Sequence, residues 1–202
     1  MQERQAKFIV VSGLSGSGKS IALNVLEDSG FNCIDNLPVS LFETLVRDLS
    51  IEQPEQMRRM AIGIDARIPD TELTKVPELV KQLASHGVDC EVVFLEADND
   101  VLIQRFSETR RRHPLTDKNN SLESAIKLER ELLNPLRDAA QLQINTSRTT
   151  LHELRAIIQS RVVNRATGQL SLMLQSFGFK HGAPRNADFV FDMRCLPNPH
   201  WN

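Results

Sequence analysis

The segment Gly13-Leu14-Ser15-Gly16-Ser17-Gly18-Lys19-Ser20 constrains this 202-residue chain more than any other. It matches the phosphate-loop pattern G-x-x-x-x-G-K-[ST] in full. Glycines let successive backbone N–H groups turn toward phosphate oxygens, and a helix starting near Lys19 adds the positive end of its dipole. We expect Lys19 to reach the β- and γ-phosphates and the Ser20 hydroxyl to ligate Mg²⁺. A strand pattern precedes the segment and a helix pattern follows it, so we predict a phosphate-binding loop rather than an inconsequential glycine-rich turn.

Strand and helix patterns alternate along the chain as far as Val163. One predicted helix carries a capping-box spacing, with Thr150 three residues before Glu153. Another, opened by Pro38, is expected to present one apolar face made of Leu41, Phe42, Leu45, Val46 and Leu49. Predicted strands cover 7–12, 31–34, 60–65, 91–96 and 141–145, and further helices start near Lys19, Asp70, Asp98 and Ser121. This order predicts an α/β fold, a three-layer sandwich with a mostly parallel sheet covered on both faces.

The rhythm changes after Val163. Residues 164–168 are polar, and two strand-like segments follow at 170–175 and 187–193. A tail of roughly 35 residues is too short to form a robust core by itself. We therefore predict a nucleotide-binding domain over 1–163, and a hinge with the N-terminal fragment of an incomplete second α/β domain over 164–202.

Composition excludes several classes of protein. The formal net charge of −2 leaves no whole-molecule basic field to attract nucleic acid. Three separated cysteines, Cys33, Cys90 and Cys195, suggest neither a disulfide framework nor a zinc site. Apolar runs fall short of the ~18 to 20 residues that cross a bilayer, and no signal-peptide pattern is present. A cytoplasmic protein without membrane attachment is expected.

A phosphate-loop protein that uses Mg²⁺ also needs a carboxylate at the end of a neighbouring strand. Asp65 ends the third predicted strand and is the first candidate for the metal's water shell. Asp35, Glu96 and Asp98 compete for that role, and Asp35 also suits a second substrate or a positioned water. Any of these carboxylates can instead simply cap the turn that follows it.

Two basic segments are further candidates. Arg110, Arg111 and Arg112 follow a predicted helix, where small phosphate-loop kinases carry a lid whose guanidinium groups close over the phosphoryl group; a solvated charge run is the alternative. Lys180 and His181 lie between two glycines, as in an anion-binding nest or an ordinary surface loop.

Several separated motifs resemble the RapZ/YvcJ family of bacterial nucleotide-binding proteins. They are the phosphate loop, Phe31-Asn32-Cys33-Ile34-Asp35-Asn36-Leu37-Pro38, Ser107-Glu108-Thr109-Arg110-Arg111-Arg112-His113-Pro114-Leu115, Ser176-Phe177-Gly178-Phe179-Lys180-His181-Gly182 and Leu196-Pro197-Asn198-Pro199-His200-Trp201. These motifs occur in the family's order and span nearly the whole chain. The resemblance implies a P-loop kinase-like N-terminal domain, with ATP at Gly13 to Ser20 and a guanine-nucleotide segment at Asp65, Ala66, Arg67 and Ile68. Ile68 replaces a residue that is usually polar in the family.

The resemblance also implies roles for the tail. In such RNase adapter proteins the C-terminal domain is tied to RNA binding, sugar-phosphate sensing and delivery of a small regulatory RNA to a ribonuclease. Lys180, His181, Asp192 and His200 are then expected to help form an anion or sugar-phosphate pocket. The basic region expected to contact RNA is missing from these 202 residues.

Three functions stay open at this stage. The first is a regulatory protein that binds ATP or GTP with Mg²⁺ and hydrolyses it slowly, with Lys19, Asp65 and the three arginines as catalytic groups. The second is a P-loop kinase that phosphorylates a small metabolite. The third is a binding module that nucleotide merely stabilises, and a homo-oligomer is left open for all three. Fold alone cannot separate these functions.

Overall fold

The computed structural model describes residues 7–51, 59–116, 120–164, 176–178, 180 and 189–196. The chain divides into two compact units, Met1–Gln169 and Leu170–Asn202. The predicted domain boundary after Val163 remains a prediction.

A five-stranded sheet forms the centre of the first unit. In chain order the strands are β1 (Lys7–Gly13), β2 (Asn32–Ile34), β3 (Arg59–Ile64), β4 (Asp89–Glu96) and β5 (Leu142–Asn145). Their spatial order is β2-β3-β1-β4-β5, and every neighbouring pair is parallel. This arrangement confirms the predicted sheet and its five strands. It also brings the carboxyl ends of β1, β3 and β4 to one edge, where such folds bind ligands.

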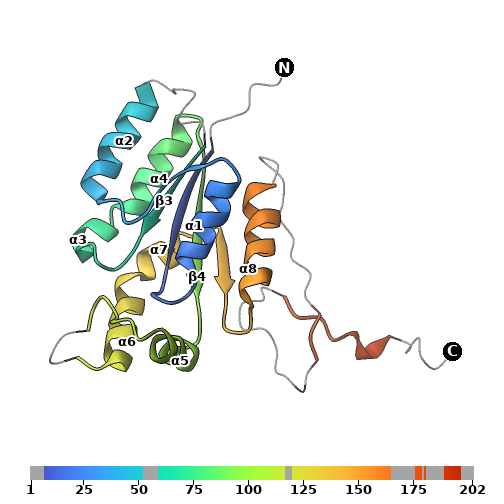
Figure 1. Ribbon diagram of the computed structural model, residues 1–202. Helices are drawn as coiled ribbons and strands as arrows, with labels where there is room; N and C mark the ends of the chain where they lie inside the picture. The colour runs from blue at the N-terminus through green and yellow to red at the C-terminus, as the bar shows by residue number, and fades with distance from the viewer. Residues whose placement is uncertain are drawn as a thin grey trace. The chain divides into compact units, whose positions relative to one another are not determined.

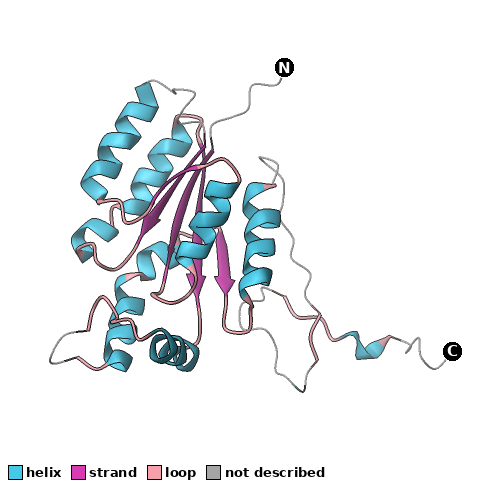
Figure 2. Cartoon of the chain, viewed as in Figure 1, coloured by secondary structure: helices cyan, strands magenta, loops and turns pink. Residues whose placement is uncertain are grey.

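Helices cover both faces of the sheet (Figure 1). In chain order they are α1 (Lys19–Asp28), α2 (Val39–Ile51), α3 (Asp70–Leu73), α4 (Val76–Ser85), α5 (Asn99–Thr109), α6 (Leu122–Leu132), α7 (Asn134–Asp138) and α8 (Leu151–Ile158). Helices α1 and α8 lie side by side over one face and contribute to one apolar cluster. The other face is covered by α2, α4 and α7, with α5 and α6 near its carboxyl edge (Figure 2).

Strand β1 shows how the sequence divides between the two clusters. Phe8 and Val10 belong to one cluster, and Ile9 and Val11 to the other, as the two-residue period of a strand requires. All four side chains are buried. Because β1 is buried on both faces, its side chains are apolar on both, which explains the continuous apolar run in the sequence.

Two local predictions have clear outcomes. Thr150 and Glu153 form the predicted capping box at the start of α8. The predicted apolar face of α2 is wrong at Leu41, which is 56% exposed, whereas Phe42 and Val46 are buried. Leu41 lies one residue before Phe42, a rotation of about 100° that turns it away from the face centred on Phe42 and Val46.

The second unit is described only at 176–178, 180 and 189–196. The predicted strand over 187–193 is wrong for the residues described there, because 189–192 lack regular structure and Met193–Cys195 form a 3₁₀ turn. That turn begins where the Asp192 carboxylate accepts a hydrogen bond from the Arg194 N–H. A strand needs a partner ladder, and within these residues a local side-chain bond stabilises a turn instead. The predicted strand at 170–175 lies outside the described residues. Among the described residues, no helix is long and apolar enough to span a membrane.

Candidate functional site

The predicted phosphate loop connects the carboxyl end of β1 to the start of α1. Gly13, Gly16 and Gly18 all have positive φ, at 142°, 85° and 109°. A Cβ on Gly13 would stand 2.0 Å from the Leu95 carbonyl oxygen, so the loop passes directly against β4. Only glycine meets both the backbone and the space requirements at that position.

Three carbonyl groups of the loop accept side-chain hydrogen bonds, one from Lys19 of the loop itself and two from outside the loop. The Lys19 ammonium donates to the Gly13 carbonyl at 2.6 Å, Arg105 on α5 donates to Gly16 at 2.9 Å, and the Thr146 hydroxyl donates to Ser17 at 3.0 Å. Among the described residues, no group accepts a hydrogen bond from the N–H of Gly16, Gly18, Lys19 or Ser20. The loop therefore presents unpaired N–H groups at a helix N-terminus, a concave site suited to an anion.

Lys19 lies among three carboxylates. Burial lowers the pKa of its ammonium, and the negative charges of Glu129, Asp65 and Asp35 partly offset that effect. The three carboxylates come from α6, from the end of β3 and from the end of β2. Tertiary structure thus places a cation and three anions at the edge of the sheet where the loop begins.

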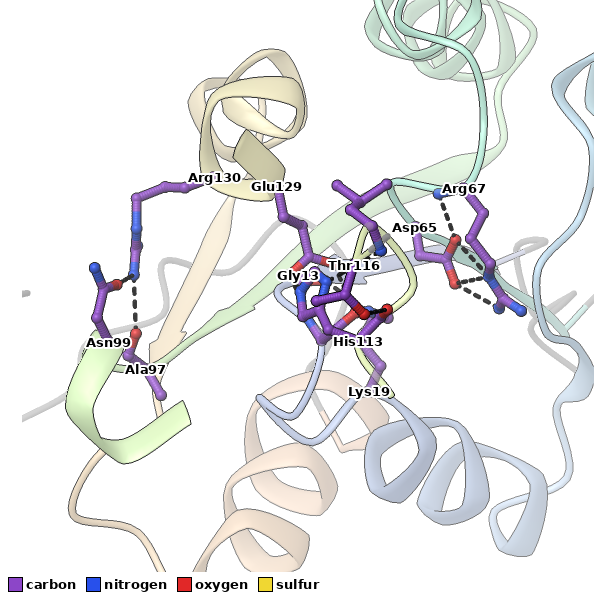
Figure 3. A network of polar contacts seen from close by, with 12 residues as sticks. Gly13, Lys19, Asp65, Arg67, Ala97, Asn99, His113, Thr116, Glu129 and Arg130 are labelled. Carbon is purple, nitrogen blue, oxygen red and sulfur yellow. Dashed lines mark hydrogen bonds and ion pairs between the residues drawn. The ribbon is translucent and has the colours of Figure 1, made fainter. Parts of the chain in front are cut away.

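Asp65 follows β3 and is tied to Arg67. Its carboxylate accepts hydrogen bonds from the Arg67 N–H at 3.0 Å and from the guanidinium at 2.6 and 3.0 Å (Figure 3). Burial raises the pKa of Asp65, but the hydrogen bonds from Arg67 outweigh it and leave the pKa below its ordinary value. Ala66 and Ile68 are buried in the larger apolar cluster, so their side chains are not available to a ligand.

Asp35 lies over Gly63 of β3. A Cβ on Gly63 would stand 2.4 Å from one oxygen of the Asp35 carboxylate, which shows how closely the two strand ends approach. The Asp35 residue is exposed. It is therefore open to a second ligand at the edge where Asp65 also lies.

Glu96, a competing candidate for the metal, is engaged elsewhere. Its carboxylate lies 3.3 Å from both Arg130 and Arg137. Arg130 also donates to the Ala97 carbonyl and to the Asn99 side chain, fixing the turn between β4 and α5 (Figure 3). Asp98, the other competitor, is the N-cap residue of α5. Glu96 and Arg130 thus join β4, α5 and α6.

Sequence reasoning missed Glu129, which is central to the site. The Ser15 N–H donates to its Oε2 at 2.9 Å, the Ser15 hydroxyl to its Oε1 at 2.6 Å, and His113 Nε2 lies 3.0 Å from Oε2. Both the Glu129 and His113 side chains are fully buried. Burial raises the pKa of Glu129, but hydrogen bonds from His113 and Ser15 and the charge of Lys19 bring it below its ordinary value. The available signal was helical spacing, since Glu129 follows buried Ala125 by four residues and precedes buried Leu133 by four.

The predicted basic segment lies beside this pair. Arg110 ends α5 with a positive φ of 52°, and Arg110, Arg111 and Arg112 are all exposed. The next residue, His113, is buried against Glu129 and the Phe106 ring, at 5.1 Å between ring centroids. An exposed arginine segment is thus anchored at one end by a buried histidine.

The predicted anion pocket of the tail is described only in part. Lys180 is exposed, and Asp192 pairs with Arg194 at 2.5 Å. Hydrogen bonds from Arg194 lower the pKa of Asp192 to about 2. His181 and His200 lie outside the described residues, so the pocket stays a prediction.

Comparison with known proteins follows the division into two units. Residues 6–166 match the RapZ-like N-terminal domain, and residues 170–202 match the RapZ C-terminal domain. The chain belongs to the RapZ family. This confirms the resemblance seen in its separated motifs.

Curated relatives agree with this assignment. A nucleotide-binding protein of Cellvibrio japonicus is 55% identical over 96% of this chain and 65% of its own length. A nucleotide-binding protein of Methylococcus capsulatus is 52% identical over 96% of this chain and 66% of its own length. The chain therefore spans about two thirds of the length of these relatives.

Solved structures share the fold. Shikimate kinase from Acinetobacter baumannii, in complex with shikimate, superposes with a TM-score of 0.52 at 19% identity, over 80% of this chain and 96% of that one. The YorR protein from Bacillus subtilis, in complex with phosphorylated GDP, gives 0.50 at 15% identity, over 77% of this chain and 95% of that one. The fold is a P-loop kinase fold, as predicted.

Proposed function

We propose that this chain binds a nucleoside triphosphate, ATP or GTP, with Mg²⁺ and hydrolyses it slowly. One observation carries the proposal: the N–H groups of Gly16, Gly18, Lys19 and Ser20 have no acceptor among the described residues, while the carbonyls of Gly13, Gly16 and Ser17 accept hydrogen bonds from Lys19, Arg105 and Thr146. The Ser17 hydroxyl is also buried without a partner among the described residues. The name of the Cellvibrio japonicus relative, a nucleotide-binding protein, supports the proposal.

Two residues of the loop would bind different parts of the nucleotide–Mg²⁺ complex. Lys19 would leave the Gly13 carbonyl for the β- and γ-phosphates, and Ser20 at the first turn of α1 would hold Mg²⁺. Mg²⁺ in such sites takes most of its remaining ligands from phosphate and water. The bound metal neutralises charge on the phosphates.

Asp65 has two competing roles, in the metal's water shell or in the guanine segment with Ala66, Arg67 and Ile68. Both roles compete with Arg67 for the carboxylate oxygens. Asp65→Asn separates them. A metal role predicts weaker binding only when Mg²⁺ is present, and a base role predicts an altered preference between ATP and GTP at any Mg²⁺ concentration.

We further propose that nucleotide binding serves regulation in the complete protein. Family membership and the match of residues 170–202 to the RapZ C-terminal domain support a cytoplasmic RNase adapter that binds RNA and a ribonuclease through that domain. Lys180, His181, Asp192 and His200 would then contribute to a sugar-phosphate pocket. Whether the protein forms a homo-oligomer stays open in this proposal.

One observation favours a second candidate, a kinase for a small metabolite. The Asp35 residue is exposed beside Gly63, at the same sheet edge as Asp65 and Lys19. An exposed carboxylate there could accept the proton of an attacking hydroxyl group. Nucleotide turnover measured with and without a metabolite library separates the candidates, because a kinase is stimulated by one acceptor and a regulator by none.

Lys19→Ala tests nucleotide binding itself. Binding should weaken at least about 100-fold, about 2.8 kcal/mol, because the variant loses a cation at the β- and γ-phosphates. The matched control is Lys75→Ala, which removes an exposed lysine paired with Glu43. Titration calorimetry and thermal unfolding report affinity and folding. Unchanged affinity in a folded Lys19→Ala protein would exclude the proposed phosphate site.

A further inference from the structure

The Glu129 carboxylate joins two segments that are far apart in the sequence. It holds Ser15 in the phosphate loop through both the N–H and the hydroxyl, and it holds His113 at the end of the arginine segment. Glu129 is itself on α6, so the contacts bring three elements to one carboxylate. Figure 3 shows Glu129 beside His113. A fully buried carboxylate is costly unless it is hydrogen-bonded, and here three donors satisfy it.

The hydrogen bonds of His113 fix its tautomer. The Leu115 N–H donates to His113 Nδ1 at 3.2 Å, so Nδ1 carries no proton. Nε2 must then carry the proton that it donates to Glu129. The His113 carbonyl also accepts hydrogen bonds from the Thr116 N–H and hydroxyl, at 3.0 and 2.7 Å. The turn over 113–116 is thus held in one conformation, and its orientation toward the loop depends on Glu129.

We propose that Glu129 is a positioning residue, which through Ser15 and His113 couples the phosphate loop to the arginine segment 110–112. The proposal rests on the proposed function, because the arginines of 110–112 would be positioned against the terminal phosphate of a nucleotide. Ser15 contacts Glu129 through both its N–H and its hydroxyl, and among the carboxylates around Lys19 the charge of Glu129 raises the pKa of the Lys19 ammonium most. A nucleotide that orders the loop at Ser15 then also fixes the base of the arginine segment.

Hydrogen exchange measures this coupling directly. In the 202-residue protein, a Mg²⁺-bound, non-hydrolysable ATP analogue should slow exchange in both 13–20 and 110–116. In His113→Phe the analogue should still protect 13–20 but should no longer protect 110–116. Phenylalanine keeps an aromatic contact with Phe106 and removes the donor to Glu129. Unchanged protection of 110–116 in this variant would overturn the proposal.

Substitutions at Glu129 supply a graded series. Glu129→Gln keeps an oxygen for Ser15 N–H and His113, and its amide group can donate to the Ser15 hydroxyl, so coupling should be largely retained. Glu129→Ala removes all three contacts and should abolish coupling. The matched control is Glu123→Gln on the same helix, whose side chain is 62% exposed and pairs with Lys127. It should behave as wild type.

Turnover distinguishes positioning from a merely structural role. His113→Phe should lower kcat about tenfold while nucleotide affinity changes less than about threefold, since positioning acts on the reacting state. In a protein already lacking the arginines (Arg110, Arg111 and Arg112 to Gln), His113→Phe should lower kcat little further. Additive losses would show that His113 and Glu129 act independently of the arginines.

Failure of the proposed function has a separate signature. If wild type binds no nucleotide, exchange in the free protein still decides the coupling. His113→Phe and Glu129→Ala should each speed exchange of the Ser15 amide relative to Glu123→Gln. Equal Ser15 exchange in all of these proteins would contradict the proposal irrespective of nucleotide.

Discussion

The two units of the chain differ in how far apart in the sequence their contacts lie. In the first unit, the hydrogen bonds between Ser15 and Glu129 span 114 residues. In the described part of the second unit, Asp192 pairs with Arg194, two residues away. Phe189 and Phe191 there are 80% and 75% exposed and stack on each other, at 6.4 Å between ring centroids. The site of the first unit therefore depends on its whole tertiary structure, whereas the described contacts of the second unit are local.

A substitution at Gly13 should disturb the long-range contacts of the first unit most. Gly13→Ala should cost more than about 3 kcal/mol, because a Cβ would clash with the Leu95 carbonyl and the backbone has a positive φ. Gly87→Ala is the matched control, with positive φ but no atom within 4 Å of its Cβ, and should cost about 1 kcal/mol. Urea unfolding measures both. Equal costs would mean that the loop does not need its close approach to β4.

The arginine segment belongs to the first unit, yet Arg110, Arg111 and Arg112 are exposed, as are residues 189–196 of the second unit. Replacing Arg110, Arg111 and Arg112 together with Gln should lower nucleotide turnover about tenfold and change affinity less, because lid arginines act on charge that develops during reaction. Steady-state kinetics with calorimetry measures both quantities. If neither changes, the segment is a solvated charge run.

Acid should distinguish the buried carboxylates of the first unit from the exposed one of the tail. The pKa values of Glu129 and Asp65 lie below their ordinary values of 4.5 and 3.8. Their stabilisation is therefore complete above those ordinary values and is lost as pH falls through the lower, folded pKa values. The free energy of unfolding of wild type, measured in urea, should decrease below about pH 4.5. In Glu129→Gln this free energy should depend less steeply on pH. Asp192→Asn should leave the dependence of the first unit unchanged, and a matching change would show that the units share their acid stability.

The smallest effect is expected from removing the tail. A chain ending at Arg165 should unfold cooperatively and bind ATP within about twofold of the 202-residue protein, because the described site residues and core of the first unit lie before that point. Limited proteolysis should cut the longer chain first at 164–168, unless a partner chain or a domain swap protects that segment. Insolubility or lost binding in the shorter chain would place the tail within the first core.

Much of the fold could be predicted because its signals are local. The loop over 13–20 and the capping box at Thr150 are recognisable from the types and spacing of consecutive residues, and the strands buried on both faces appear as apolar runs. Glu129 could not be assigned a partner, because no local pattern shows that α6 packs over Ser15. The strand predicted over 187–193 failed for a related reason: alternation shows which side chains can share a face, but not whether a partner strand is present.

A hydrogen bond connects the first and the last described elements of the first unit. Lys7 at the start of β1 donates to the Val162 carbonyl in the final π-helical turn, Gln159–Val163. Fraying of β1 at Lys7 or of the turn Gln159–Val163 breaks this contact, so each of these two segments helps to hold the other in place. Removing either of these two segments would remove the contact that stabilises the other. Joining them by a short linker, with new termini opened in a surface loop, would preserve the contacts around the phosphate loop.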